Sequence, residues 1–80
     1  MTNGEIGKLI GLSYSAVSRL RRGERLPSIA VMVAIQEAFG WSITDQVWVR
    51  SYAGAVGYSQ VFNDELAAYT HRLNRAVEVG

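Results

Sequence analysis

The chain has 80 residues, no cysteine and a net charge of +1, and apolar residues make up 49% of it. This length fits one domain with a single hydrophobic core. Without cysteine there are no disulfides or thiolate metal sites, a composition typical of the cytoplasm. The longest apolar run covers residues 29–35, far short of the roughly 20 residues that span a membrane. So much apolar surface on so short a chain predicts an interface with another chain.

Charge is distributed unevenly along the chain. Residues 1–28 hold five basic and two acidic residues, a net charge of +3, whereas residues 29–80 hold three basic and five acidic residues, a net charge of −2. A basic end opposite an acidic one suits a module that presents one surface to nucleic acid. Ordinary surface charge explains the same difference equally well, so charge alone does not decide between the two.

The first predicted helix begins at once. Thr2 and Glu5 have the spacing of a capping box, in which each side chain bonds the backbone N–H of the other residue. Apolar residues then recur at helical spacing as far as Ile10. Gly11 supplies the left-handed residue that commonly ends a helix.

A second helix is predicted over residues 14–22. Ser13 is a suitable N-cap for it, and Val17 and Leu20 form its buried side. Gly23 ends it, after arginines whose charge favours the last turn of a helix.

The third predicted helix, residues 29–39, lies between a capping serine and a closing glycine. Pro27 stops any continuation of the second helix, Ser28 is the N-cap, and Gly40 ends the helix. Its residues are apolar almost all round, which predicts a central place in the core.

The remaining chain predicts two more helices with a glycine-rich break between them. The fourth helix covers residues 42–52, with Ile43 and Val47 facing inward, and residues 53–57 form a loop or a broken turn. The last helix, within residues 58–78, begins near Ser59 or Asn63. It carries an apolar stripe at helical spacing, formed by Phe62, Leu66, Tyr69, Leu73 and Val77.

The first two predicted helices carry the pattern of a known motif. Apolar, small and glycine residues stand at its fixed places, namely Ile6, Gly7, Ile10, Gly11, Leu12, Val17 and Leu20. Gly7 allows the two helices to cross closely and Gly11 accommodates the turn. An R-x-G-x-R-x-P-S segment follows at residues 21–28. Together these features resemble the Cro/phage-repressor (XRE) helix-turn-helix family over roughly residues 2–52.

The resemblance implies an all-α fold of about five helices, lambda-repressor-like with a C-terminal helix, as one domain over residues 1–80. It also implies a short repressor of phage or actinobacterial type. The family normally has a full helix before the motif, whereas here the motif begins at residue 2. Either the C-terminal helix fills the corresponding groove, or the groove is left as an apolar surface for a partner.

The family's base-reading positions fall on the second helix. Because they project opposite to Val17 and Leu20, they face outward, and Arg19 is suited to a bidentate pair with guanine O6 and N7. The predicted base-reading residues are Tyr14, Ser15, Ser18 and Arg19. The predicted phosphate contacts, which set register rather than sequence, are Asn3, Ser13, Arg22, Arg25 and Ser28. Each of these contacts has a structural alternative: the two serines can serve only as helix caps, and the two arginines can be solvated surface residues. Lys8, on the first helix, is interpreted as a surface residue.

The predicted function is therefore a sequence-specific repressor of the Cro type, which binds a double-stranded DNA operator as a homodimer in the cytoplasm of a bacterial cell. The dimer surface is the stripe of Phe62, Leu66, Tyr69, Leu73 and Val77, with Trp48 as a further candidate. Packing of the stripe within the chain, in place of the missing first helix, is the alternative. A second reading is an antitoxin-like or accessory module that binds another protein through its apolar C-terminal half. No catalytic constellation is visible, and we expect no metal, cofactor, small-molecule ligand or membrane partner.

Overall fold

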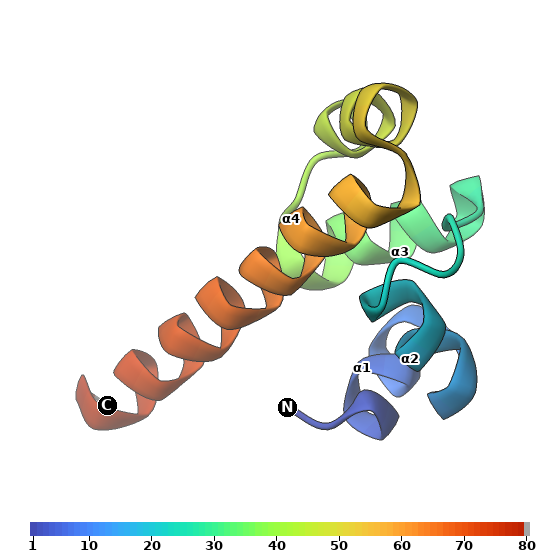
Figure 1. The fold of residues 1–80 in the computed structure, drawn as a ribbon. Helices are drawn as coiled ribbons and strands as arrows, with labels where there is room; N and C mark the ends of the chain where they lie inside the picture. Colours follow the sequence, from blue (N-terminus) through green and yellow to red (C-terminus); the bar gives the residue numbers. More distant parts are fainter. Residues whose placement is uncertain (80) are drawn as a thin grey trace.

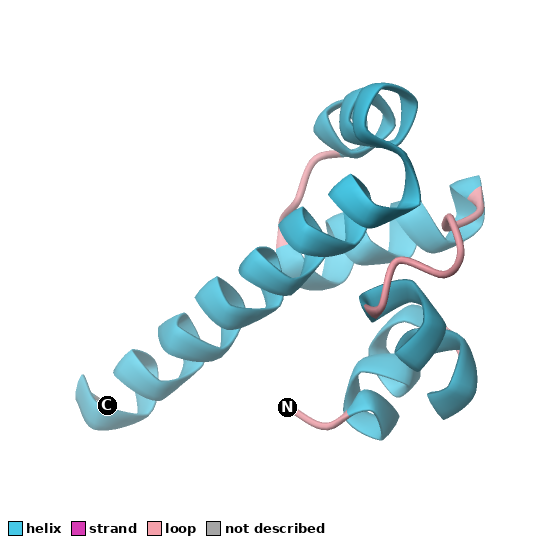
Figure 2. Cartoon of the chain, in the orientation of Figure 1, coloured by secondary structure: helices cyan, strands magenta, loops and turns pink. Residues whose placement is uncertain are grey.

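The computed structural model describes residues 1–79, with side chains as far as residue 77, and these residues form four helices joined by loops (Figures 1 and 2). The helices are α1 (Asn3–Ile10), α2 (Tyr14–Arg21), α3 (Ile29–Phe39) and α4 (Ile43–Val79). No strand occurs among the described residues, so the predicted all-α fold is confirmed. None of the helices in this part of the chain combines the length and the apolar character that a membrane crossing requires.

The caps predicted for the first helices are present. Thr2 and Glu5 form both bonds of the capping box, each 3.1 Å long. The bond that the backbone N–H of Thr2 donates holds the pKa of the Glu5 carboxyl below its usual value, because it stabilises the charged form. Gly11 ends α1 with φ at 73°, in the left-handed region. These local bonds fix where α1 begins and ends.

Gly7 sets how closely α1 approaches the chain that follows it. A side-chain Cβ at this position would overlap the backbone carbonyl oxygen of Leu12. The Gly7 carbonyl itself accepts a hydrogen bond of 2.9 Å from the backbone N–H of Leu12. Only glycine leaves room for this contact, so Gly7 allows the turn after α1 to lie directly against that helix.

The last helix is long and bends sharply at Gly54. This residue has φ 68° and ψ −165°, a conformation essentially restricted to glycine. Residues 43–53, the proximal segment, therefore run in a different direction from residues 55–79, the distal segment (Figure 1). Of the loop or broken turn predicted over residues 53–57, the structure forms the broken turn, at Gly54 alone. The helix start predicted near Ser59 or Asn63 is wrong, because the chain is helical again from residue 55. One glycine is enough to turn the chain, and the alanines beside it remain helical.

The distal segment completes the core around the first three helices. It contributes Tyr58, Phe62 and Leu66, which are buried together with Ile6 of α1 and Leu20 of α2. Aromatic contacts extend this packing to α3, whose last residue Phe39 lies edge-on to Phe62, with ring centroids 6.4 Å apart. Of the two alternatives that the sequence left open, the C-terminal helix is the one that braces the motif.

This packing divides the apolar stripe that was predicted as a dimer surface. Phe62 is fully buried and Leu66 is 4% exposed, so both are core residues and are not accessible to a partner. Tyr69 is half-buried against Phe39, with ring centroids 4.9 Å apart. Leu73 and Val77 are 44% and 80% exposed. The first part of the stripe is therefore intramolecular packing, and only its end remains open.

A buried glutamine joins the two segments of α4. Gln46 is fully buried, and its Nε2 donates to the backbone oxygens of Met32 and Trp41 at 2.8 and 2.9 Å. Its Oε1 accepts a 2.9 Å hydrogen bond from the hydroxyl of Tyr58. Val47, which the sequence analysis placed inward, is 45% exposed instead. The proximal segment thus turns a polar residue inward, and the bonds of Gln46 connect α3, the turn before α4 and the distal segment.

The buried Tyr58 makes stability sensitive to alkaline pH. Burial raises the pKa of its phenol above the usual value of about 10, and nearby Arg50 opposes this only in part. Because the unfolded chain loses this proton first, the stabilisation is complete below about pH 10 and falls by about 1.4 kcal/mol per pH unit above it. Denaturant unfolding between about pH 9 and 11 should show this slope, and Tyr58→Phe should flatten it. Equal slopes for the two proteins would contradict the prediction.

Candidate nucleic-acid interface

α2 has one buried and one exposed face. Ala16, Val17 and Leu20 pack inward and are at most 9% exposed. The residues predicted to read bases lie on the other side: Tyr14 is 64% exposed, Ser15 and Arg19 are also exposed, and Ser18 is half-buried. The structure therefore brings these four side chains together on the outward surface of a single short helix.

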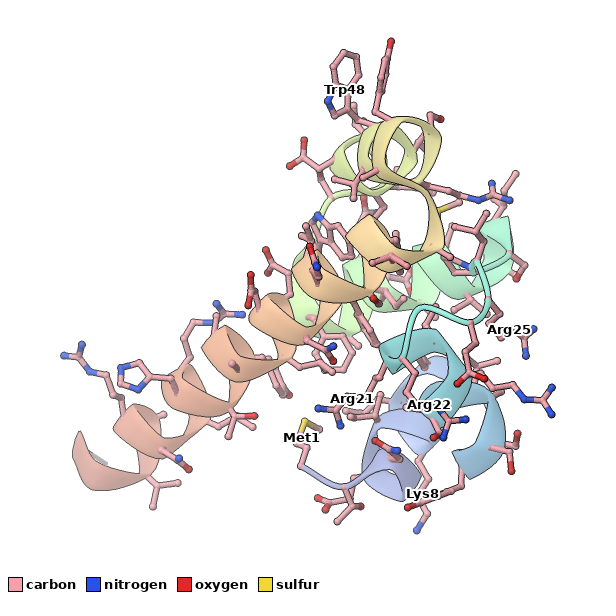
Figure 3. The ribbon with its side chains drawn as sticks, viewed as in Figure 1. Met1, Lys8, Arg21, Arg22, Arg25 and Trp48 are labelled. Atoms are coloured by element: carbon pink, nitrogen blue, oxygen red, sulfur yellow. The ribbon has the colours of Figure 1, made fainter. Side chains whose placement is uncertain are left out.

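Exposed basic side chains also lie on α1 and on the chain that follows α2. Figure 3 shows Lys8, Arg22 and Arg25 there, at the opposite end from Trp48, and all three are exposed. The Arg22 side chain forms an ion pair with Glu24, and both side chains are more than half exposed. Such surface pairs contribute little free energy, so a phosphate can replace Glu24 as the partner of Arg22. The charge of this end is thus available to DNA.

The two serines predicted as phosphate contacts are also helix caps. The hydroxyl oxygen of Ser13 accepts from the backbone N–H of Ala16 at 3.2 Å, and that of Ser28 accepts from Val31 at 3.3 Å. Both serines are exposed. Since each hydroxyl acts here as an acceptor, its own hydrogen remains able to donate to a phosphate. The capping role is established, and the DNA contact stays a prediction.

Asn3 is part of a cluster that the sequence did not reveal. Arg21, the last residue of α2, donates from its guanidinium to Oδ1 of Asn3 at 2.8 Å and to Oδ1 of Asn63 at 2.9 Å. Asn63 returns a bond from its Nδ2 to the backbone oxygen of Arg21 at 3.0 Å. The cluster fastens the end of α2 to α1 and to the distal segment of α4. Arg21 is therefore a structural residue, and the Oδ1 of Asn3 is already occupied.

The distal segment also approaches the residue that follows α2. Gly23 has φ at 73°, and a Cβ there would lie 3.0 Å from the Cα of Val56 and 3.1 Å from the hydroxyl oxygen of Ser59. Glycine therefore permits both the turn and the close approach of α4 at this point. Together with the Arg21 cluster, this contact holds α2 in a fixed orientation.

A shallow cavity of about 380 Å³ lies between the start of the chain and the distal segment. It is lined by Met1, Ile6, Arg21, Asn63, Leu66, Ala67, Thr70, His71 and Asn74. Within the described part of the chain, no three histidine, aspartate or glutamate side chains come together as a metal site would require. The polar groups of the cavity include Arg21 and Asn63, whose hydrogen bonds are already made within the protein.

Two short helices that cross at a glycine turn, the second with an exposed basic face, define a helix-turn-helix DNA-binding protein. Residues 1–46 match the model of the helix-turn-helix family of the Cro/lambda-repressor (XRE) type. The chain belongs to this family, as its sequence motif predicted, and is a DNA-binding regulator of transcription. No match to the chain was found among curated proteins or among solved structures.

Proposed function

We propose that the protein is a transcriptional repressor of the Cro type, which occupies its operator with α2 in the major groove. The observation that carries this proposal is the outward face of α2, where the exposed Arg19 has no hydrogen-bond or ion-pair partner among the described residues. An arginine with a free guanidinium can donate two bonds to guanine O6 and N7. Tyr14, Ser15 and Ser18 are the other base-reading residues.

The residues around α2 would position it on the DNA backbone. Exposed Arg22 and Arg25 supply charge for phosphates, and Ser13 and Ser28 supply hydroxyls beside helix N-termini. Asn3 retains its amide nitrogen for such a contact, while its oxygen bonds Arg21. These contacts set the register of α2 and give binding its dependence on salt.

Two copies of the protein on one operator would bind DNA more tightly than a single copy. A single module of this kind buries only roughly 600–1,000 Å² on DNA, and two modules on half-sites about 34 Å apart double that contact. We therefore propose a homodimer that forms at least on the operator, in the cytoplasm of a bacterial cell, without cofactor or small-molecule ligand. Of the predicted stripe, the exposed Leu73 and Val77 remain available for a contact between copies.

Selection of bound sites from random double-stranded DNA, repeated at low and high salt, tests the proposal. We expect one enriched sequence at both salt concentrations, arranged as an inverted repeat of two half-sites. Retention without an enriched sequence, lost steeply as salt rises, would reduce the function to nonspecific binding. Absence of retention at low salt would contradict DNA binding itself.

A second candidate function is an antitoxin-like or accessory role in which another protein binds the C-terminal half. The observation in its favour is the end of the distal segment, which projects from the body of the molecule with Leu73 and Val77 exposed (Figure 1). Arg19→Ala separates the two functions. It weakens operator recognition but leaves a protein partner on the distal segment bound.

A further inference from the structure

Asn63, on the distal segment of α4, bonds both the side chain and the main chain of the last residue of α2. Its Oδ1 accepts a 2.9 Å bond from the Nε of Arg21, and its Nδ2 donates a 3.0 Å bond to the backbone oxygen of Arg21. Figure 3 shows Arg21 pointing from α2 toward the distal segment. Both polar groups of the Asn63 amide are therefore used on one residue, which lies 42 positions earlier in the chain.

The bond to the backbone completes the C-terminal end of α2. The last four carbonyls of a helix have no partner within that helix. In α2, three of them accept from backbone N–H groups of the turn that follows the helix, and the fourth, that of Arg21, accepts from Asn63. A helix of eight residues is not stable by itself in water. The end of α2 thus depends on a donor from the distal segment.

The side chain of Arg21 carries the same constraint to α1. Its Nη1 donates a 2.8 Å bond to Oδ1 of Asn3, the first residue of α1. The guanidinium is planar, so its bonds to the two asparagines fix its orientation. Asn3 is a proposed phosphate contact, and its amide nitrogen is the group left for the DNA. Asn63 therefore controls, through Arg21, how this amide is held.

The residue type at position 63 is explained by these bonds and not by its place in a helix. Asparagine is a weaker helix former than alanine or leucine, because its side chain competes for backbone hydrogen bonds. Asn63 nevertheless lies inside the distal segment, between the buried Phe62 and Leu66, and is itself partly buried. An apolar residue at this position would pack as well, but it would leave Arg21 without an acceptor and without a donor.

We propose that Asn63 is a positioning residue for DNA binding, which sets operator affinity from outside the proposed interface. It acts through Arg21 on the end of α2 and on the amide of Asn3. The inference rests on the proposed function, because it takes α2 and Asn3 to lie on the operator. It extends that function by giving the distal segment, which supplies none of the proposed DNA contacts, a part in recognition.

The loss of Asn63 should affect operator DNA and nonspecific DNA differently. Without it, the end of α2 and the Asn3 amide must be ordered when the operator binds, and the entropy cost of this ordering lowers the affinity. Arg21 keeps its positive charge, and nonspecific binding depends mainly on charge. A residue that only stabilised the fold would lower both affinities equally, in proportion to the folded fraction.

Anisotropy titrations of Asn63→Ala with operator and with nonspecific DNA, at fixed salt, test the proposal. We expect operator affinity to fall by about 3- to 10-fold, the equivalent of one hydrogen bond, and nonspecific affinity to stay within about twofold. Alanine favours the helix, so the distal segment should remain helical, and melts define a temperature at which the variant is fully folded. The matched control is Asn74→Ala, at an exposed position of the same segment, which should change neither affinity.

Two further variants show whether Asn63 acts through Arg21. Asn63→Asp keeps an acceptor for the Nε of Arg21, so it should bind the operator more tightly than Asn63→Ala, with Asn74→Asp as the control for the added charge. In an Arg21→Met background, Asn63→Ala should cost little further operator affinity, because the two changes disrupt the same bonds.

Three results would overturn the inference: operator affinity of Asn63→Ala within twofold of the wild type, equal losses on the two DNAs, or losses that add to those of Arg21→Met. A wild-type chain that binds no DNA would instead contradict the proposed function. Amide NMR spectra of the free protein separate the two cases. Asn63→Ala should shift the signals of the end of α2 and of the Asn3 side-chain amide, and unchanged signals would refute the positioning role whatever the DNA result.

Discussion

Arg19→Ala is expected to weaken binding to the selected operator by about 5- to 150-fold, because a bidentate arginine–guanine pair contributes about 1–3 kcal/mol of discrimination. The exposed side chain forms no hydrogen bond or ion pair within the described part of the protein, so the melting temperature should stay close to that of the wild type. Titration of a labelled operator, read by fluorescence anisotropy at fixed salt, measures the loss. Specificity should relax at one base position of each half-site.

Two further variants distinguish the charge of Arg19 from its hydrogen bonding to a base. Arg19→Lys keeps the charge but lacks the planar fork of donors, so it should recover binding to nonspecific DNA without recovering operator selectivity. Arg75→Ala removes an exposed arginine from the distal segment, far along the chain from α2, and serves as the matched control for loss of one positive charge. Full recovery of operator affinity by Arg19→Lys would show that Arg19 contacts a phosphate and reads no base.

The features that the sequence predicted well depend on residues close together in the chain. The capping box of Thr2 and Glu5 and the serine caps of α2 and α3 are bonds between residues three positions apart. Gly11 and Gly40 end their helices in the left-handed conformation that glycine favours. These signals locate three helices and the turn between α1 and α2. Since the proposed interface lies on this turn and α2, its position follows from local patterns and from the family motif.

The features that the sequence did not predict depend on residues far apart in the chain. Arg21 bonds Asn63, which is 42 positions away, so no local pattern indicated that this arginine is structural whereas Arg22 is exposed. The division of the apolar stripe between core and surface has the same origin. By their spacing, Phe62 and Val77 lie on the same apolar face of the helix. Phe62 is buried and Val77 is exposed because the distal segment leaves the body of the molecule between them.

The inward face of the proximal segment was predicted wrongly for a related reason. Helix periodicity predicts a buried face from apolar residues, which favoured Val47 over its polar neighbour Gln46. The structure buries Gln46 because Met32, Trp41 and Tyr58 together supply partners for both ends of its amide. Polar groups are buried where their hydrogen bonds are satisfied, and this depends on three residues outside the segment.

That dependence makes Gln46 the position where we expect the largest loss of stability. Gln46→Leu keeps most of the side-chain volume but removes three hydrogen bonds, which leaves the Tyr58 hydroxyl without an acceptor and takes one donor each from the carbonyls of Met32 and Trp41. Each buried polar group left without a partner costs about 1–3 kcal/mol, so we expect a total of roughly 3–5 kcal/mol. In a domain of this size the melting temperature falls by about 4–8 °C per kcal/mol.

Calorimetry or a circular-dichroism melt measures this loss against Gln60→Leu, the same substitution at an exposed position of α4. The control should melt within a few degrees of the wild type. In the double variant Gln46→Leu with Tyr58→Phe, both partners of the shared bond are apolar, so the loss should be smaller than the sum of the two single losses. If Gln46→Leu melts as high as Gln60→Leu, or if the single losses simply add, the buried amide does not hold the two segments of α4 together.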